Sequence, residues 1–587
     1  MRENIKILYD IPVTMKDGTV LYCDVYRPDN EKKYPAIVNR TPYLKDNINP
    51  LSGYMHAHKL AARGYNVVIQ DVRGSANSEG ILDPSGHQDE DGFDTIEAIA
   101  AMEWCDGNVG MMGESYHGFS QLAAARAQPP HLKAICPFQT SWTKFPAVYG
   151  FGIFSPVLFF WIYGRAFDNE KYHPVLSEET KRVMKKYLKD SEEQLRYRPL
   201  KDMPAACMDE IPMLSFQREL LENITNIDYL KEIGRTEGFE QVQVPAFELT
   251  GWNDFLRDET IYNYVEFKKR GGNERVRKGG RLIVGPWQHG DVLSDSLLGQ
   301  YFGEEAGGDA VDISGKIADW YDFWIKGKDS EFMSGNPVHL FVMGINQWRT
   351  EKDWPVPDTC YKKMYLHSEG HSNTMKGDGR LSWDRPGDEP EDCYTYDPDN
   401  PVPSEIKPTK EFPYAAVTQD QRVNENRDDV LVYTTEPLNG ELEIIGPVEA
   451  YIYASSSAVD TDYVCKLIDV WEDGTAFCLM KKLVRARYRN GRKEELLEPG
   501  KIYEYRIPVG NTAIVLKKGH ALRMEVTSSL FPDADCNLNT GGAEQGMKRL
   551  GKKLYKKYFI VRNIHPVSFY RQEKMYQSNS NTQKGVT

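Results

Sequence analysis

Ser115 lies in a segment whose composition suits an exposed nucleophile. Residues 109–118 read Val-Gly-Met-Met-Gly-Glu-Ser-Tyr-His-Gly and join a short apolar run to the helically spaced Phe119–Ala127. A serine on a sharp strand-to-helix turn is exposed at the carboxyl end of its strand, with the helix N-terminus beneath it. The usual G-x-S-x-G spacing is not met, because His117 occupies the second glycine position and Gly118 follows it. From this segment alone, an ordinary serine in a glycine-containing turn remains an alternative.

Two later segments supply an acid and a base. In hydrolases with this kind of turn, the order along the chain is serine, acid, histidine, and each partner follows a strand. Asp254 ends a Gly-Trp-Asn-Asp sequence after the apolar run Ala246–Thr250, and His289 lies in Gly-Pro-Trp-Gln-His-Gly after Arg281–Val284. We therefore predict Ser115 as the nucleophile, His289 as the general base, and Asp254 as the group that orients the histidine.

The elements that must position these residues follow an α/β pattern. Short β-rich runs alternate with helical patterns up to about residue 140, and strand-like runs resume after residue 245, which predicts a largely parallel sheet with crossover helices. The first strands are expected at Val20–Val25, Ala36–Arg40, Tyr65–Gln70, Gly110–Gly113 and Leu132–Pro137. Between residues 141 and 245 the pattern changes to charged helical segments such as Ser177–Leu195 and Met213–Glu222, which predict a helical cap.

A third region begins near residue 355. It contains strand-like runs at short spacing, with Gly, Asn, Asp or Pro in their connections, and these features predict a jelly-roll β-sandwich. The runs are Asp429–Thr434, Val448–Ala454, Val464–Trp471, Phe477–Arg487, Ile502–Val509 and Ala521–Thr527. The predicted organisation is a hydrolase core at 1–140 and 246–350, a cap at 141–245, a sandwich at 355–575 and a polar tail at 576–587.

Three motifs together resemble a known family. The sequence contains G-x-S-Y-x-G at the serine, G-W-x-D at the acid and G-P-W-x-H-G at the histidine, as in the cocaine esterase-like (CocE/NonD) hydrolases grouped with X-prolyl dipeptidyl peptidases and α-amino-acid ester hydrolases. Further matches are Arg40–Tyr43, Asp71–Ser75, Ser528–Pro532 and Asn537–Gly541. The resemblance spans nearly the whole chain and implies an α/β-hydrolase fold with a serine esterase activity.

The resemblance also implies an oxyanion hole. Its donors would be the backbone N–H of Tyr116 and the phenol of Tyr43, because a protonated phenol can donate to a developing oxyanion. Without the resemblance, a core tyrosine after a strand would be the simpler interpretation of Tyr43. The implied reaction is attack by Ser115 on an acyl carbonyl, formation of an acyl-enzyme, and hydrolysis by water that His289 activates.

Composition excludes several other classes of protein. The net charge of −14 argues against nucleic acid as a partner, and nine cysteines without a CxxC pair indicate neither a disulfide framework nor a zinc site. Residues 533–544 begin like a calcium loop, but Leu538 occupies the position where that loop requires glycine, so no metal or cofactor is expected. The segment Phe151–Phe167 is too short to span a membrane and predicts a cap helix or pocket wall. No signal peptide is recognised, so we expect a cytoplasmic protein, and the sequence leaves open whether it forms a homo-oligomer.

Apolar side chains near the predicted site suggest a hydrophobic acyl pocket. Trp142 and Trp161 belong to the cap side, and Phe255 and Leu256 directly follow the acid. A small-molecule ester or amide is the expected substrate.

An X-Pro dipeptidyl peptidase or an α-amino-acid ester hydrolase would need acidic residues to hold the substrate ammonium. The residues after the acid are Phe255, Leu256 and Arg257, which leaves Asp258 and Glu259 as substitutes, so these activities rank second. A carbohydrate-binding protein with an inactive hydrolase domain ranks third. In the third region, Arg485, Arg487 and Arg489 alternate along an expected strand, and we interpret them as a solvated face.

Overall fold

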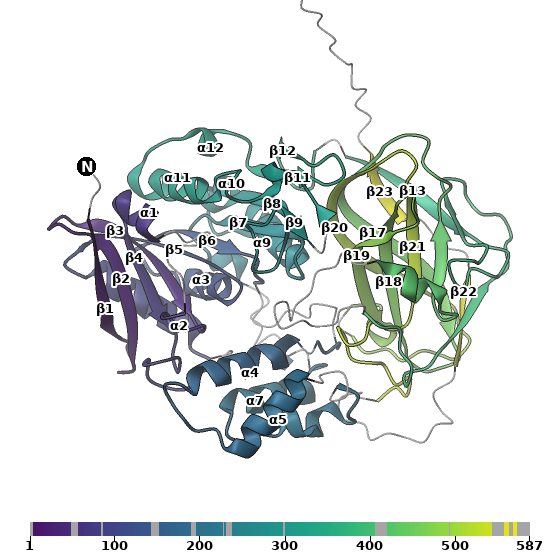
Figure 1. Ribbon diagram of the computed structural model, residues 1–587, viewed down its shortest axis with the longest axis horizontal. Helices are drawn as coiled ribbons and strands as arrows, with labels where there is room; N and C mark the ends of the chain where they lie inside the picture. Colours follow the sequence, from purple (N-terminus) through teal and green to yellow (C-terminus); the bar gives the residue numbers. More distant parts are fainter. Residues whose placement is uncertain are drawn as a thin grey trace, which may run out of the picture.

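The protein has three parts, shown in Figure 1: an α/β core, a small helical lobe below it, and a β-sandwich beside both. The computed structural model describes residues 4–47, 57–83, 86–142, 152–155, 157–189, 195–226, 228–229, 238–297, 300–357, 359–404, 420–491, 493–542, 557–562 and 567–571. The predicted polar tail lies outside these residues. The α/β-hydrolase fold with helices inserted before β7 and a C-terminal sandwich agrees with the predicted fold class.

A ten-stranded sheet forms the middle of the α/β core. Its strand order is β1-β2-β4-β3-β5-β6-β7-β8-β11-β12, and the seven strands from β4 to β11 in this order are mutually parallel. The strands are β1 (Ile5–Thr14), β2 (Val20–Pro28), β3 (Tyr34–Thr41), β4 (Asn66–Asp71), β5 (Cys105–Glu114), β6 (Leu132–Phe138), β7 (Phe247–Asn253), β8 (Arg281–Gln288), β11 (Val338–Val342) and β12 (Gln347–Glu351). Strands buried on both faces are apolar without alternation, which explains why β6, β7 and β8 could be found in the sequence, whereas the largely exposed edge strand β1 was missed.

Helices cover both faces of this sheet. Adjacent residues of one strand point into different clusters, Val38 toward helices α2 and α3 and Ile37 toward α1 and α11. The helices are α1 (Ala57–Ala62), α2 (Gln88–Ala100), α3 (Tyr116–Ala127), α9 (Arg257–Arg270), α10 (Glu274–Gly279), α11 (Ile313–Lys326) and α12 (Glu331–Ser334). The carboxyl ends of the central strands therefore remain as the edge at which functional loops can gather.

The helical lobe has its own apolar cluster. Helices α4 (Val157–Asn169), α5 (Glu178–Lys189) and α7 (Pro212–Glu222) pack around buried side chains that include Phe159 and Tyr187. Val72 and Leu82 of the α/β core belong to the same cluster, so the lobe packs directly onto the core. In the part of the chain that the structure describes, no helix has the length and apolarity needed to cross a membrane.

The C-terminal part is a sandwich of two sheets that β13 joins, and all of their strand pairs are antiparallel except β14 with β16. One sheet contains β15, β22, β17, β20, β23 and β13, and the other contains β14, β16, β21, β18 and β19. The strands are β13 (Cys360–His367), β14 (Arg380–Ser382), β15 (Asp392–Tyr396), β16 (Leu431–Thr434), β17 (Leu442–Ser456), β18 (Asp462–Val470), β19 (Ala476–Arg485), β20 (Tyr503–Leu516), β21 (Ala521–Thr527), β22 (Lys557–Arg562) and β23 (Val567–Arg571). A single apolar cluster continues from this sandwich into β8 and β11 of the α/β core.

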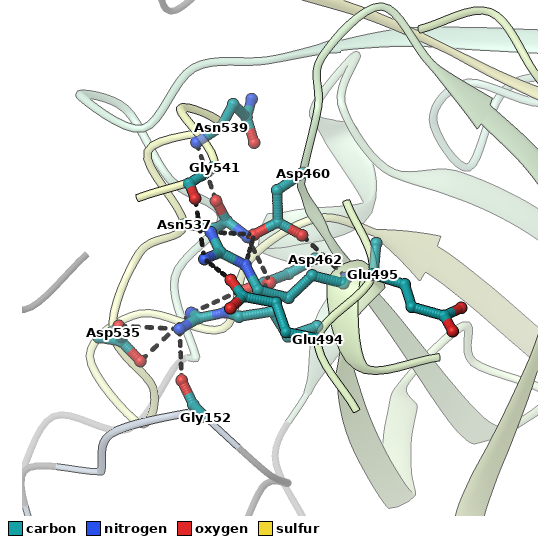
Figure 2. A network of polar contacts seen from close by, with 12 residues as sticks. Gly152, Asp460, Asp462, Glu494, Glu495, Asp535, Asn537, Asn539 and Gly541 are labelled. Carbon is teal, nitrogen blue, oxygen red and sulfur yellow. Dashed lines mark hydrogen bonds and ion pairs between the residues drawn. The ribbon is translucent and has the colours of Figure 1, made fainter. Parts of the chain in front are cut away.

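The prediction that Arg485, Arg487 and Arg489 form a solvated face is wrong. Strand β19 ends at Arg485 and a 3-10 turn follows, so the arginines do not alternate along one strand, and Arg485 and Arg487 are both 3% exposed. The Arg485 guanidinium donates two hydrogen bonds of 3.0 Å to the carboxylate of Asp462, and the Arg487 Nε donates one of 2.6 Å to Asp460. Figure 2 shows these groups as one network, which satisfies the buried charges.

The same network connects the sandwich to the lobe. Arg485 Nη1 donates to the carbonyl oxygen of Gly152 at 2.6 Å, and Asp535 lies 3.4 Å from Arg485 (Figure 2). Asp535 also accepts a hydrogen bond of 2.7 Å from the Phe154 N–H. The Asp535 N–H in turn donates to the Phe154 carbonyl at 2.9 Å. The chain is thereby held by the sandwich a few residues before helix α4 begins.

Candidate active site

Ser115 occupies a strained turn between β5 and α3. Its φ and ψ are 56° and −122°, which few residues other than glycine adopt, so the surrounding contacts must impose this conformation. A Cβ added at Gly113 would lie 2.3 Å from the His117 Cβ, and one at Gly118 would lie 2.6 Å from the Thr140 Cβ. The tight packing therefore requires glycine at 113 and 118.

The three predicted triad residues lie in one hydrogen-bonded chain. His289 Nε2 is 3.0 Å from Ser115 Oγ, and His289 Nδ1 is 3.0 Å from Asp254 Oδ1. Asp254 is 2% exposed, and its Oδ1 and Oδ2 accept further hydrogen bonds from the Leu256 N–H at 2.9 Å and the Thr250 hydroxyl at 3.0 Å. This arrangement lets His289 take a proton from Ser115 while Asp254 holds the imidazole in one orientation.

Gln139 supports the histidine loop and was not found from the sequence. Its side-chain Nε2 donates to the Gln288 carbonyl at 2.7 Å, and its Oε1 accepts from the Gly290 N–H at 2.8 Å. The two contacts bracket His289 in the chain. Gln139 directly follows β6, and this position after a central strand was the only signal in the sequence.

Charges around His289 favour its protonated form. Burial alone would lower the pKa of His289, but the charge and hydrogen bond of Asp254 and the charge of Glu114 outweigh burial and raise that pKa above its usual value. Burial raises the pKa of Glu114 to about 7; positive charge on His289 opposes this rise, and Asp254 and Asp291 add to it. Because Glu114 and His289 interact, the pH dependence of the site belongs to both groups.

Glu114→Gln is expected to extend activity to lower pH. The base must be neutral to accept the Ser115 proton, so activity falls as pH drops through the pKa of His289, and removing the Glu114 charge lowers that pKa. The midpoint of the acidic limb of kcat/KM against pH should fall by about half a unit to one unit. Glu274→Gln, on the surface of α10, is the control and should leave the midpoint unchanged; an unchanged midpoint in Glu114→Gln would contradict the coupling.

The two predicted oxyanion-hole residues both contact Trp161. Tyr116 begins α3, directly after Ser115, and its ring stacks on Trp161 with centroids 5.4 Å apart. Tyr43 is half-buried, and its hydroxyl accepts a hydrogen bond of 3.2 Å from the Trp161 Nε1. His117 packs edge-on against the Tyr43 ring with centroids 5.0 Å apart, and burial lowers the pKa of this histidine to about 3, so its imidazole is neutral. His117 therefore contributes packing and a 2.9 Å hydrogen bond with the Thr41 hydroxyl, without a charge.

The predicted pocket residues lie in different surroundings. Phe255 lies against the base, with its ring centroid 4.4 Å from that of His289, and Leu256 is buried beside Asp254. Trp142 was assigned to the pocket wrongly. It is 1% exposed and stacks on Phe239 with centroids 4.0 Å apart, in the apolar cluster that α2 and α3 share with the sheet. The position of Trp142 before a long insertion suggested that it belongs to the cap, but its large ring packs in the core.

The acidic residues that follow the acid loop have partners. Asp258 accepts two hydrogen bonds from the Arg257 guanidinium, at 3.0 and 2.9 Å, and two from Asn511 of the sandwich, at 2.9 and 2.8 Å. One carboxylate oxygen of Glu259 is 3.5 Å from the Ser141 hydroxyl. Burial raises the pKa of Glu259, and the positive charge of Lys482 opposes this rise. Asp258 is therefore used for structure, which weakens its candidacy as a substrate anchor.

The segment that begins like a calcium loop is engaged in protein contacts. Asp533 forms a 2.8 Å ion pair with Lys481 and accepts a 2.9 Å hydrogen bond from Ser404, and Asp535 contacts Arg485. Among the described residues, no group of three or more His, Cys, Asp or Glu side chains is arranged to hold a metal ion.

Comparisons with known proteins show the family of the chain. A family model described as X-Pro dipeptidyl-peptidase (S15 family) matches residues 17–291, and one for the C-terminal non-catalytic domain of X-Pro dipeptidyl-peptidase matches residues 330–554. Cocaine esterase from Rhodococcus sp. (strain MB1 Bresler) is 35% identical over 549 residues, which cover 92% of this chain and 93% of that protein. The chain belongs to the cocaine esterase-like family of serine hydrolases.

Other relatives of this cocaine esterase-like hydrolase are more distant. A putative serine esterase of Mycobacterium bovis is 25% identical over 525 residues, 81% of this chain and 80% of that protein. The crystal structure of an α-amino acid ester hydrolase has a TM-score of 0.78 at 23% identity and covers 97% of both chains. An aminopeptidase from a marine sediment Thaumarchaeota archaeon also has a TM-score of 0.78, at 24% identity, over 97% of this chain and 96% of that one. At these identities the two solved structures support the shared fold alone.

Proposed function

We propose that this serine hydrolase cleaves esters of small hydrophobic acyl groups, with Ser115, His289 and Asp254 as its catalytic triad. The observation that carries the proposal is the chain of 3.0 Å contacts from Asp254 through His289 to the Ser115 hydroxyl. The similarity to cocaine esterase over 92% of the chain favours an ester as the substrate.

The proposed reaction has two acyl-transfer steps. His289 takes the Ser115 proton as the serine oxygen attacks the acyl carbonyl, and Asp254 stabilises the resulting imidazolium without becoming protonated. The Tyr43 phenol and the Tyr116 N–H donate to the oxyanion, and each such donor is typically worth about 3–4 kcal/mol in the transition state. His289 then protonates the leaving alcohol. In the second step His289 takes a proton from water as the water oxygen attacks the acyl carbonyl, and it returns that proton to the Ser115 oxygen as the bond between serine and acyl group breaks and the acid is released.

The pocket proposal rests on side chains at two sides of the triad. Phe255 contacts His289, and Trp161 approaches Tyr116 and Tyr43 from the lobe, so an apolar acyl group bound between them would contact aromatic rings. Leu256 completes the proposed apolar set.

An X-Pro dipeptidyl peptidase is the second candidate, because the family models for that peptidase match both halves of the chain. Recognition of a substrate ammonium would require an available carboxylate, and Asp258 is already bound by Arg257 and Asn511. The esterase therefore ranks first.

The test compares p-nitrophenyl acetate, butyrate and benzoate with Ala-Pro p-nitroanilide and its N-acetyl derivative. We expect kcat/KM to be at least about 100-fold larger for the best ester, because the ester has the more reactive acyl group and Asp258 is already held by Arg257 and Asn511. Faster cleavage of the anilide, lost when its ammonium is acetylated, would establish the peptidase instead.

We also propose a cellular location and a division of the chain into domains. All nine cysteines lie in described residues and are free thiols, which supports a reducing compartment such as the cytoplasm. We assign the triad to the hydrolase core at 1–140 and 246–350, Trp161 to the cap at 141–245, and support of the cap to the sandwich at 355–575. We include a homo-oligomer in the proposal as a state that a measurement of molecular mass in solution would test.

A further inference from the structure

The Tyr43 hydroxyl is in contact with a helix that contributes none of the triad residues. Trp161 of α4 donates its indole N–H to the Tyr43 oxygen at 3.2 Å. An indole N–H can only donate, whereas a phenol oxygen can accept and its O–H can donate at the same time. The contact therefore leaves the Tyr43 hydrogen available for a second acceptor, and the proposed oxyanion would be that acceptor.

Arg165 lies one helical turn after Trp161 and contacts the same tyrosine. Residues four apart share one face of a helix, and the Arg165 guanidinium carbon lies 4.3 Å from the centroid of the Tyr43 ring. The Arg165 Nη2 forms a 2.9 Å ion pair with Asp168, but its Nε and Nη1 are buried and make no hydrogen bond with any residue that the structure describes. Much of the cationic group is therefore directed at the face of the aromatic ring.

We propose that Trp161 and Arg165 are positioning residues that make Tyr43 a stronger oxyanion donor. When the Tyr43 O–H donates to the oxyanion, negative charge accumulates on the phenol oxygen. The Trp161 N–H stabilises that charge by a hydrogen bond, since consecutive hydrogen bonds strengthen one another, and the Arg165 cation stabilises it through the ring. The inference deepens the proposed function and rests on Tyr43 as an oxyanion donor.

Contacts at both ends of α4 hold these two side chains in place. Before the helix, Arg485 and Asp535 of the sandwich bind the backbone at Gly152 and Phe154. At its end, Asn169 Oδ1 accepts from the Ala76 N–H at 2.9 Å, in a loop of the α/β core. The helix is thus anchored to both neighbouring parts of the protein, and the middle of it faces Tyr43.

The competing interpretation is that Trp161 is only a wall of the acyl pocket. Its ring stacks on Tyr116 within 15° of parallel, and a wall residue would act through ring area. Phenylalanine retains an aromatic ring but has no N–H. Trp161→Phe therefore removes the hydrogen bond but keeps an aromatic ring for stacking. Arg165→Met removes the positive charge but keeps a side chain of similar length.

The experiment measures kcat and KM for p-nitrophenyl butyrate in the full-length protein and in a double-mutant cycle. Tyr43→Phe should lower kcat about 100-fold, as for loss of one oxyanion donor. Trp161→Phe should lower kcat about fivefold, the rate equivalent of one ordinary hydrogen bond, with KM within about twofold. In the Tyr43→Phe background, Trp161→Phe should cause no further loss, because its effect passes through the absent hydroxyl.

Arg165 provides a second cycle that does not depend on the tryptophan variant folding well. Arg165→Met should lower kcat about threefold, Arg165→Lys should retain more activity than Arg165→Met, and neither loss should persist with Tyr43→Phe.

Three outcomes would overturn the inference: equal losses in both backgrounds, a change confined to KM, or full kcat in both Trp161→Phe and Arg165→Met. Full kcat in Tyr43→Phe would instead refute the proposed oxyanion role of Tyr43, so failure of the inference and failure of the function are distinguishable.

Discussion

Ser115→Ala is expected to lower kcat for p-nitrophenyl esters by at least about 10⁴-fold, because no other group can form the acyl-enzyme at this position. Ser115 Oγ is the atom 3.0 Å from His289 Nε2, and alanine removes that atom while retaining a Cβ in the same backbone conformation. The variant should therefore fold as the wild type does. Steady-state turnover and labelling by a fluorophosphonate ester measure the two consequences, loss of hydrolysis and loss of the covalent adduct.

Ser120→Ala is the matched control. Ser120 lies on α3, the helix that follows Ser115, and is fully buried, but its hydroxyl donates to the His117 carbonyl and not to His289. This variant should retain most of the activity and the covalent labelling. Wild-type turnover by Ser115→Ala would require a different nucleophile and would refute the proposed mechanism.

Arg485→Met is expected to lower the free energy of unfolding by about 3–5 kcal/mol, the usual cost of removing one partner from a buried ion pair. Without the guanidinium, the carboxylates of Asp462 and Asp535 would remain buried close together, and Gly152 would lose its hydrogen bond to the sandwich. Urea unfolding, monitored by tryptophan fluorescence and by residual ester turnover, measures the loss. Because this contact precedes α4, we expect turnover to disappear at lower urea concentration than the fluorescence change.

Arg506→Met is the control for charge loss. Arg506 also pairs with a carboxylate, that of Glu449, but its side chain is 63% exposed, and exposed ion pairs contribute at most about 1 kcal/mol. Equal effects of the two variants would show that burial of the Arg485 network does not matter for stability.

Much of the fold could be predicted because the central strands are buried on both faces. Strands β3 to β8 are apolar runs bounded by glycine, proline or polar residues, and this pattern identifies parallel strands without any knowledge of contacts. Strand β1 has largely exposed residues and was missed, since an edge strand does not require a continuous apolar run. The arginines around 485 were misinterpreted for a related reason, because a turn after β19 ends the alternation that the sequence suggests.

The residues of the candidate site could also be predicted only in part. The types and order of Ser115, Asp254 and His289 were evident because each stands directly after a strand, where the chemistry demands a particular side chain. Gln139 also follows a strand, and Trp161 was predicted to lie at the pocket, but neither contact could be predicted. Glutamine and tryptophan serve many structural purposes, and the partners of these two side chains lie 149 and 118 residues away in the chain.

The sequence by itself determined the reaction chemistry and the sheet, because motif spacing and apolar periodicity are local properties of the chain. Only the tertiary structure decided which side chains support the site. Trp142 enters the core while Trp161 reaches Tyr43, and Asp258 accepts hydrogen bonds from Arg257. These choices depend on how the lobe, the sheet and the sandwich pack against one another, and such contacts between distant residues leave no local pattern in the sequence.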